Sequence, residues 1–91
     1  MNVSLQILPL VPENQLYPVV DRVIAAIKAS GVTYVVGPME TTMQGYMDEL
    51  FEIVKQAHYI CIEAGAERVA AMIKTDFRLQ GVTIEEKTAP L

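Results

Sequence analysis

The chain carries one thiol and one imidazole, Cys61 and His58, and these are the first residues to consider for chemistry. They stand three positions apart in a stretch with helical apolar spacing, which predicts that Cys61 is buried and inert. A metal site needs clustered Cys, His or carboxylate ligands, and no such pattern surrounds the pair. We therefore expect no metal and no catalytic residue. His58 is expected at the edge of the core with a local hydrogen bond, the alternative being a pocket beneath the helix.

The segment from Gly37 to Gly45 is dense in hydrogen-bonding side chains and flanked by glycines. Its adjacent threonines, Thr41 and Thr42, point to opposite faces of a strand, so one hydroxyl can serve a ligand while the other fixes the backbone. The Glu40 carboxylate can accept hydrogen bonds from a ligand amino group or stabilise a cation. A solvated turn glutamate followed by two β-forming residues explains the pattern equally well. The glycines are too widely spaced for a phosphate-binding loop.

Periodic sequence on either side predicts the elements that position this segment. Val3 to Val11 alternates apolar and polar side chains and stops before Pro12, as a strand does. The apolar residues that follow recur at three- and four-residue spacing, which predicts a helix with Pro18 in its first turn and a glycine cap at Gly31.

The rest of the chain repeats this plan. Thr33 to Val36 and Thr41 to Gly45 predict a hairpin around Gly37-Pro38. A second helix begins near Met47 and ends at Gly65, and its core stripe comprises Met47, Leu50, Phe51, Val54, Ala57, His58 and Cys61. Val69 to Phe77 alternates again and predicts the last strand.

The order βαββαβ contains an internal offset of 34 residues. Gly31 and Gly65 both cap a helix, and each is followed four residues later by a strand valine, Val35 or Val69. Two split βαβ halves in tandem are the plan of a ferredoxin-like α+β fold. We therefore predict one domain over residues 1–91, a four-stranded antiparallel sheet with two helices on one face.

The other sheet face should mix apolar and polar side chains: Ser4, Gln6, Leu8, Leu10, Ala70, Met72, Lys74 and Asp76. A wide apolar patch rarely stays exposed, so we expect another subunit to cover part of this face. The second helix has a second apolar row, formed by Tyr46, Leu50, Ile53, Ala57 and Ile60, which favours a second packing neighbour.

Charged residues near the C-terminus allow two further expectations. Lys74 and Asp76 lie on the same side of the last strand and should pair with each other or with a neighbouring subunit. Thr83 and Glu86 form a capping-box pattern, which predicts a short helical turn after Gly81.

Composition narrows the function classes. With 11 acidic and 7 basic residues the net charge is -4, which disfavours nucleic acid as a partner. No stretch has the length of a membrane-spanning helix, and no secretory signal opens the chain. The single cysteine cannot form a disulfide within the chain and suits a reducing compartment, so we expect a cytoplasmic protein with no membrane partner.

The sequence resembles the family of small thiamine-binding proteins of ferredoxin-like fold, which bind thiamine or its hydroxymethylpyrimidine moiety. The resemblance spans nearly the whole chain. Its most specific part is Pro38-Met39 with Thr41 and Gly45, coupled to Lys74-x-Asp76-x-Arg78. Other matching stretches are Tyr34 with Gly37, Lys55 to His58, Gly65 to Val69, Ile73 to Phe77, and Glu85 to Lys87. Met43-Gln44 departs from the family, many of whose members carry an aliphatic residue and an acid there.

The resemblance implies binding without turnover, no cofactor, and homodimers that assemble into tetramers through their sheets. On this basis we predict ligand-binding roles for Ser4, Gln6, Tyr34, Met39, Glu40, Thr41, Thr42 and Met43. The polar members can satisfy an aminopyrimidine, whereas Tyr34, Met39 and Met43 can supply apolar walls for a flat ring. The alternatives are a structural or regulatory oligomer with another small-molecule ligand, and an enzyme of unknown reaction that uses Glu40 and His58.

Overall fold

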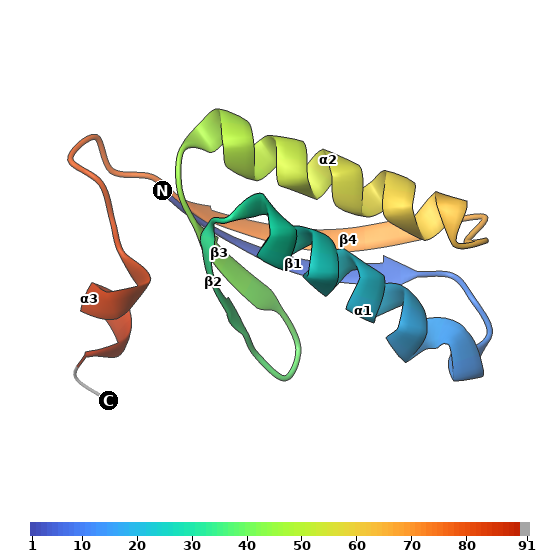
Figure 1. Ribbon diagram of the computed structural model, residues 1–91. Coiled ribbons are helices and arrows are strands. Elements are labelled where there is room, and N and C mark those ends of the chain that lie inside the picture. Colours follow the sequence, from blue (N-terminus) through green and yellow to red (C-terminus); the bar gives the residue numbers. More distant parts are fainter. Residues whose placement is uncertain (90–91) are drawn as a thin grey trace.

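A central strand organises the sheet in the computed structural model, which describes residues 1–89 (Figure 1). Strand β1 (Asn2–Pro9) pairs antiparallel with β3 (Thr41–Gln44) on one side and with β4 (Val69–Asp76) on the other. Strand β2 (Thr33–Val36) pairs antiparallel with β3, so the order is β2-β3-β1-β4. The predicted ferredoxin-like α+β fold is confirmed, and β2 and β4 are its edge strands.

Two long helices, α1 (Glu13–Ser30) and α2 (Met47–Glu63), lie side by side on one face of the sheet (Figure 1). A short third helix, α3 (Ile84–Thr88), lies apart from them near the end of the chain. Side chains between the sheet and the long helices form the core, and burying them is the main stabilising term of the fold. The core residues are Val3, Leu5, Ile7, Val19, Val23, Ile27, Met43, Leu50, Val54, Ala57, Cys61 and Ala66.

Glycine ends the first helix as predicted, because Gly31 adopts the left-handed conformation with φ 84° and its N–H bonds to the Lys28 carbonyl. Gly65, with φ 106°, follows α2 in the same way. A side chain at either position would strain the backbone. The 34-residue offset therefore corresponds to two real helix ends.

The start of the first helix differs from our prediction. α1 begins at Glu13, so Pro18 lies inside it and not in its first turn. Proline lacks an N–H and removes one hydrogen bond from the helix. The helix continues because Val19, Val23 and Ile27 bury their side chains against the sheet. Strands β1, β3 and β4 also end one or two residues earlier than predicted.

The faces of α2 are rotated slightly from the predicted ones. Leu50, Val54, Ala57 and Cys61 are buried, whereas Met47 and Phe51 are 41% and 42% exposed. The second apolar row is real, but its neighbour is α1 of the same chain. Ile53 and Ile60 line a groove between the two helices together with α1 residues, so this row gives no indication of a second subunit.

Candidate functional site

The face of the sheet opposite the long helices is its candidate functional surface. Alternation along β1 sends Val3, Leu5 and Ile7 into the core and leaves the intervening side chains on the other side. Strand register extends this pattern, since Ser4 lies opposite Thr42 on β3 and opposite Lys74 on β4. We call this surface the open face; its side chains include Asn2, Ser4, Gln6, Leu8, Val35, Thr42, Met72, Lys74 and Asp76.

A hydroxyl pair lies in the middle of the open face. Ser4 Oγ and Thr42 Oγ1 are 2.7 Å apart and form a hydrogen bond between β1 and β3. Both border a cavity of about 370 Å³ between the open face and α3, which we call the α3 cavity. Its lining residues are Asn2, Ser4, Val35, Thr42, Lys74, Thr75, Asp76, Ile84, Lys87 and Thr88. Polar groups thus converge on a space large enough for a small ligand.

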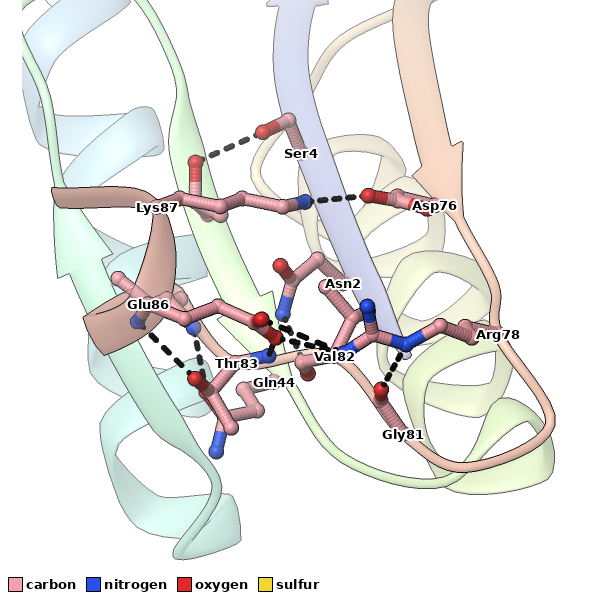
Figure 2. Close-up of polar contacts among 12 residues, drawn as sticks. Asn2, Ser4, Gln44, Asp76, Arg78, Gly81, Val82, Thr83, Glu86 and Lys87 are labelled. Carbon is pink, nitrogen blue, oxygen red and sulfur yellow. Dashed lines mark hydrogen bonds and ion pairs between the residues drawn. The ribbon is translucent and has the colours of Figure 1, made fainter.

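An internal hydrogen-bond cluster shapes the segment that carries α3 (Figure 2). The predicted capping box is present: Glu86 N donates to Thr83 Oγ1 at 3.1 Å, and Thr83 N donates to Glu86 Oε1 at 2.7 Å. Arg78 Nη2 donates to both Glu86 carboxylate oxygens, at 3.1 and 3.2 Å. The Thr83 N–H and then the Arg78 guanidinium lower the pKa of Glu86.

Three contacts tie this segment to the sheet (Figure 2). Lys87 Nζ lies 2.7 Å from Asp76 Oδ2, and this pairing lowers the pKa of Asp76. The Ile84 N–H donates to Gln44 Oε1 at 2.8 Å, and Asn2 Nδ2 donates to the Val82 carbonyl at 3.5 Å. No residue of α3 itself is buried, although Val82 just before it is. These polar contacts, together with the burial of Val82, hold α3 over the cavity.

A second hollow lies beside the first, near the tip of the β2–β3 hairpin. This hairpin depression measures about 520 Å³ and is lined by Gln6, Met39, Glu40, Met72, Ile73 and Lys74. Lys74 Nζ contacts Glu40 Oε1 at 2.7 Å. Because Lys74 borders both hollows, they are neighbours on one continuous face.

The structure separates the predicted site residues into three groups. Ser4 and Thr42 line the α3 cavity, whereas Gln6, Met39 and Glu40 line the hairpin depression. The remaining three point toward the helices: Met43 is fully buried in the core, Thr41 is 7% exposed, and Tyr34 packs against the core. Thr41 and Thr42 do face opposite sides, as expected. Ser4, Gln6 and Thr42 therefore share the open face, and the hairpin-loop residues Met39 and Glu40 border it. Four of the predicted residues also line a smaller cavity of about 100 Å³ beside α1: Gln6, Met39, Glu40 and Thr41.

The expectation that the two charges of the last strand pair with each other is wrong, whereas pairing with a neighbouring subunit stays a prediction. Lys74 pairs with Glu40 of the hairpin and Asp76 pairs with Lys87 of α3, so the two do not pair with each other. Long side chains on an edge strand reach neighbouring segments of the same chain. The sequence interpretation also missed Asn2, although alternation from Ser4 places it on the open face.

Cys61 and His58, the two residues considered first for chemistry, both lie on α2 away from the open face. Cys61 is a buried free thiol whose pKa is raised by burial. His58 Nδ1 lies 2.7 Å from the Val54 carbonyl of the preceding helical turn. His58 belongs to the helix layer and Glu40 borders the open face, so this acid/base pair does not converge.

Within residues 1–89, no three His, Cys, Asp or Glu side chains are grouped to hold a metal. No helix of these residues is long and apolar enough to cross a membrane.

Comparison with known proteins decides the family. A family model described as thiamine-binding protein matches residues 3–91. The chain belongs to the thiamine-binding protein family. A UPF0045 protein of Clostridium perfringens is 57% identical over 86 residues, which cover 94% of this chain and 90% of that protein.

Two solved structures share the fold of this chain closely. A domain of unknown function, DUF77, from Bacillus cereus is 43% identical with a TM-score of 0.89, covering 96% of this chain and 85% of that one. A proposed thiamine biosynthesis/salvage protein from Thermotoga maritima is 35% identical, also with a TM-score of 0.89, covering 98% and 95% of the two chains. The resemblance inferred from the sequence is confirmed at the level of family and fold.

Proposed function

We propose that this protein binds thiamine or its hydroxymethylpyrimidine moiety on the open face, without catalysis, in the cytoplasm. The observation that carries the proposal is the match of a thiamine-binding family model to residues 3–91. The description of the Thermotoga maritima relative as a proposed thiamine biosynthesis/salvage protein supports the same ligand class.

The chemistry of the open face suits such a ligand. Ser4 and Thr42 offer hydroxyls to ring nitrogens, and the α3 cavity of about 370 Å³ falls within the usual size of small-molecule pockets. Met39 and Met72 offer adaptable apolar contacts in the hairpin depression for a flat ring. Glu40 and Asp76 neutralise Lys74 and Lys87, so neither hollow has an unpaired lysine that would repel the permanent positive charge of a thiazolium.

Calorimetric titration with thiamine and with hydroxymethylpyrimidine tests the proposal. We expect saturable heat with at least one of them, and no heat with either at millimolar concentration contradicts the proposal. Thr42→Val should weaken binding roughly 3- to 10-fold, the effect of one hydrogen bond. Thr33→Val is the matched control, because Thr33 is an exposed strand threonine that borders neither hollow; equal losses in both variants would move the site elsewhere.

We also propose that the protein works as a homo-oligomer, with a dimer of dimers as the expected form. Large apolar side chains are exposed on the open face, Leu8 at 44% and Met72 at 64%, and directly after β4, Phe77 at 56%. Contact between subunits would remove these side chains from water. Light scattering after size-exclusion chromatography should give four chains per particle, and a monomer at micromolar concentration would contradict this assembly.

A further inference from the structure

Strand β1 is longer than the strand that pairs with it on one side. It pairs with β4 along its whole length, Asn2–Pro9, but with β3 only as far as Leu5. The β2–β3 hairpin turns back there, and the Gly37 N–H donates to the Glu40 carbonyl at 2.9 Å to close it. Ile7 therefore lies beyond the end of the hairpin, where no strand covers this side of β1.

The alternation of hydrogen bonds along β1 shows where the backbone of Ile7 points. In an antiparallel ladder every second residue exchanges N–H and C=O bonds with a given neighbour. The Gly45 N–H donates to the Met1 carbonyl at 3.1 Å, and the Leu10 N–H donates to the Arg68 carbonyl at 2.8 Å. Odd-numbered residues of β1 thus bond toward β3, and even-numbered residues bond toward β4. The N–H and C=O of Ile7 point to the β3 side, where within residues 1–89 no protein group pairs with them.

A threonine hydroxyl borders the same space. Thr41 faces the helices and is only 7% exposed. In the described part of the chain its hydroxyl forms no hydrogen bond, but the oxygen is not cut off from solvent. Thr41 and Ile7 both line the cavity of about 100 Å³ beside α1, which we call the α1 cavity. Buried polar groups nearly always have a hydrogen-bond partner, so the unpaired groups at this cavity indicate a binding site.

The rest of the α1 cavity is small and largely apolar. Side chains of α1 and of the hairpin form its walls, among them Val20, Ile24 and Val36. Pockets that enclose a whole small-molecule ligand usually measure about 300–1,000 Å³, so this one takes a group of a few atoms. Glu40 is the one charged residue of its lining among residues 1–89, and its carboxylate is already paired with Lys74 at 2.7 Å. An uncharged group therefore fits better than an ion does.

The α1 cavity can be reached from the open face beside the tip of the hairpin. Gln6, Met39 and Glu40 line both the α1 cavity and the hairpin depression. The sheet is interrupted at this point, because β3 has turned away while β1 continues. A molecule that lies in the hairpin depression can therefore place one terminal group past the hairpin tip and against the unpaired backbone of Ile7.

We propose that the α1 cavity binds the primary carboxamide or ureido group of a small molecule, recognised by the backbone of Ile7 and the hydroxyl of Thr41. Both groups present a carbonyl oxygen and an N–H on one edge, which complements the N–H and C=O of a single extended residue. A carboxylate lacks the donor and an ammonium lacks the acceptor, so neither pairs with both backbone groups of Ile7. The inference goes beyond the proposed function, because thiamine contains neither a carboxamide nor a ureido group.

Acetamide and acetone form a matched pair of probes. They share size, shape and carbonyl, but acetone has a methyl group where acetamide has its N–H donors. In an NMR titration of the isotope-labelled protein, we expect the amide nitrogen and the carbonyl carbon of Ile7 to shift saturably with acetamide. Acetone should bind about tenfold more weakly, the upper range for one neutral hydrogen bond. Equal affinity for the two probes, or no saturable shift at Ile7 with acetamide, overturns the inference.

A pair of threonine variants tests the hydroxyl. Thr41→Val should weaken acetamide binding roughly 3- to 10-fold, the effect of one hydrogen bond. Thr33→Val is the matched control, because Thr33 does not line the α1 cavity, and it should leave the affinity unchanged. Equal affinities in both variants would refute the role of Thr41. Should Thr41→Val fail to fold, the comparison of acetamide with acetone on the unmodified protein still decides the inference. Acetamide binding at Ile7 without thiamine binding would overturn the proposed function alone, and thiamine binding without acetamide binding would overturn this inference alone.

Discussion

Truncation of Met43 separates its role in the core from the ligand-binding role that the sequence suggested for it. Met43 lies on β3 opposite Val3 and Tyr34, and its side chain is fully buried. Met43→Ala should therefore leave a cavity between the sheet and the helices. Substitutions of this kind in a core cost about 2–5 kcal/mol of the free energy of unfolding.

The size of this effect relative to the whole fold makes it easy to detect. A domain of 91 residues is stabilised by roughly 5–14 kcal/mol in total. A loss of about 3 kcal/mol would lower the melting temperature by about 12–24 °C, given the usual relation for a domain of this size. Met43→Leu conserves most of the volume and should cost less than about 1.5 kcal/mol.

Thermal and urea unfolding at one fixed protein concentration, combined with thiamine titration, provide the assay. Met39→Ala is the control, since Met39 is 74% exposed and borders the hairpin depression. We expect it to change stability by about 0.5 kcal/mol at most, while weakening ligand binding. If Met43→Ala melts within a few degrees of the unmodified protein but loses ligand affinity, the placement of Met43 in the core is refuted.

Three further predictions concern charge and the single thiol. Because the pKa values of Asp76 and Glu86 are lowered in the fold, their contributions to stability are complete at neutral pH and disappear as the pH falls through those lowered values, below about 4. NMR signals of α3 should therefore change on acidification before those of the core, and simultaneous loss would contradict its polar attachment. Lys74→Met should change stability by less than about 1 kcal/mol, because the Lys74 ion pair is largely exposed, but should alter thiamine affinity in the same titration. Iodoacetamide should modify Cys61 only in denaturant, as measured by mass spectrometry, and rapid labelling of the native protein would show that the thiol is accessible.

The sequence predicts the fold well because β1, β4 and the two long helices each have a hydrophobic period, and because β-forming residues around Gly37-Pro38 indicate the hairpin. It also predicts correctly that Thr41 and Thr42 face opposite sides. It cannot say which of them faces the helices, because that depends on the register between β1 and β3. In the structure Leu5 pairs with Thr41 and Ser4 pairs with Thr42, which places Thr41 on the helix side. Pairing between strands so far apart in the sequence cannot be predicted from local sequence patterns.

The third helix shows a second limit of prediction from the sequence. Thr83 and Glu86 predict its capping box, and the structure contains it. Its position over the sheet depends on contacts such as those of Lys87 with Asp76 and of Ile84 with Gln44, between residues up to 40 positions apart. Surface polar residues can pair in many ways with similar energies, so these partners cannot be chosen from the sequence alone.

The same polar attachment explains why a cavity persists at this place in so small a protein. A helix with an apolar face would pack against the open face and fill the space beneath it. α3 has no buried residue, and fixed hydrogen bonds and ion pairs hold it along its flanks. These contacts set its distance from the sheet without requiring side chains to fill the gap. Local opening of α3 alone exposes little apolar surface, whereas Val82 just before it is buried. The space beneath α3 can therefore become accessible by movement of residues 84–88, while Val82 and the core between the sheet, α1 and α2 stay in place.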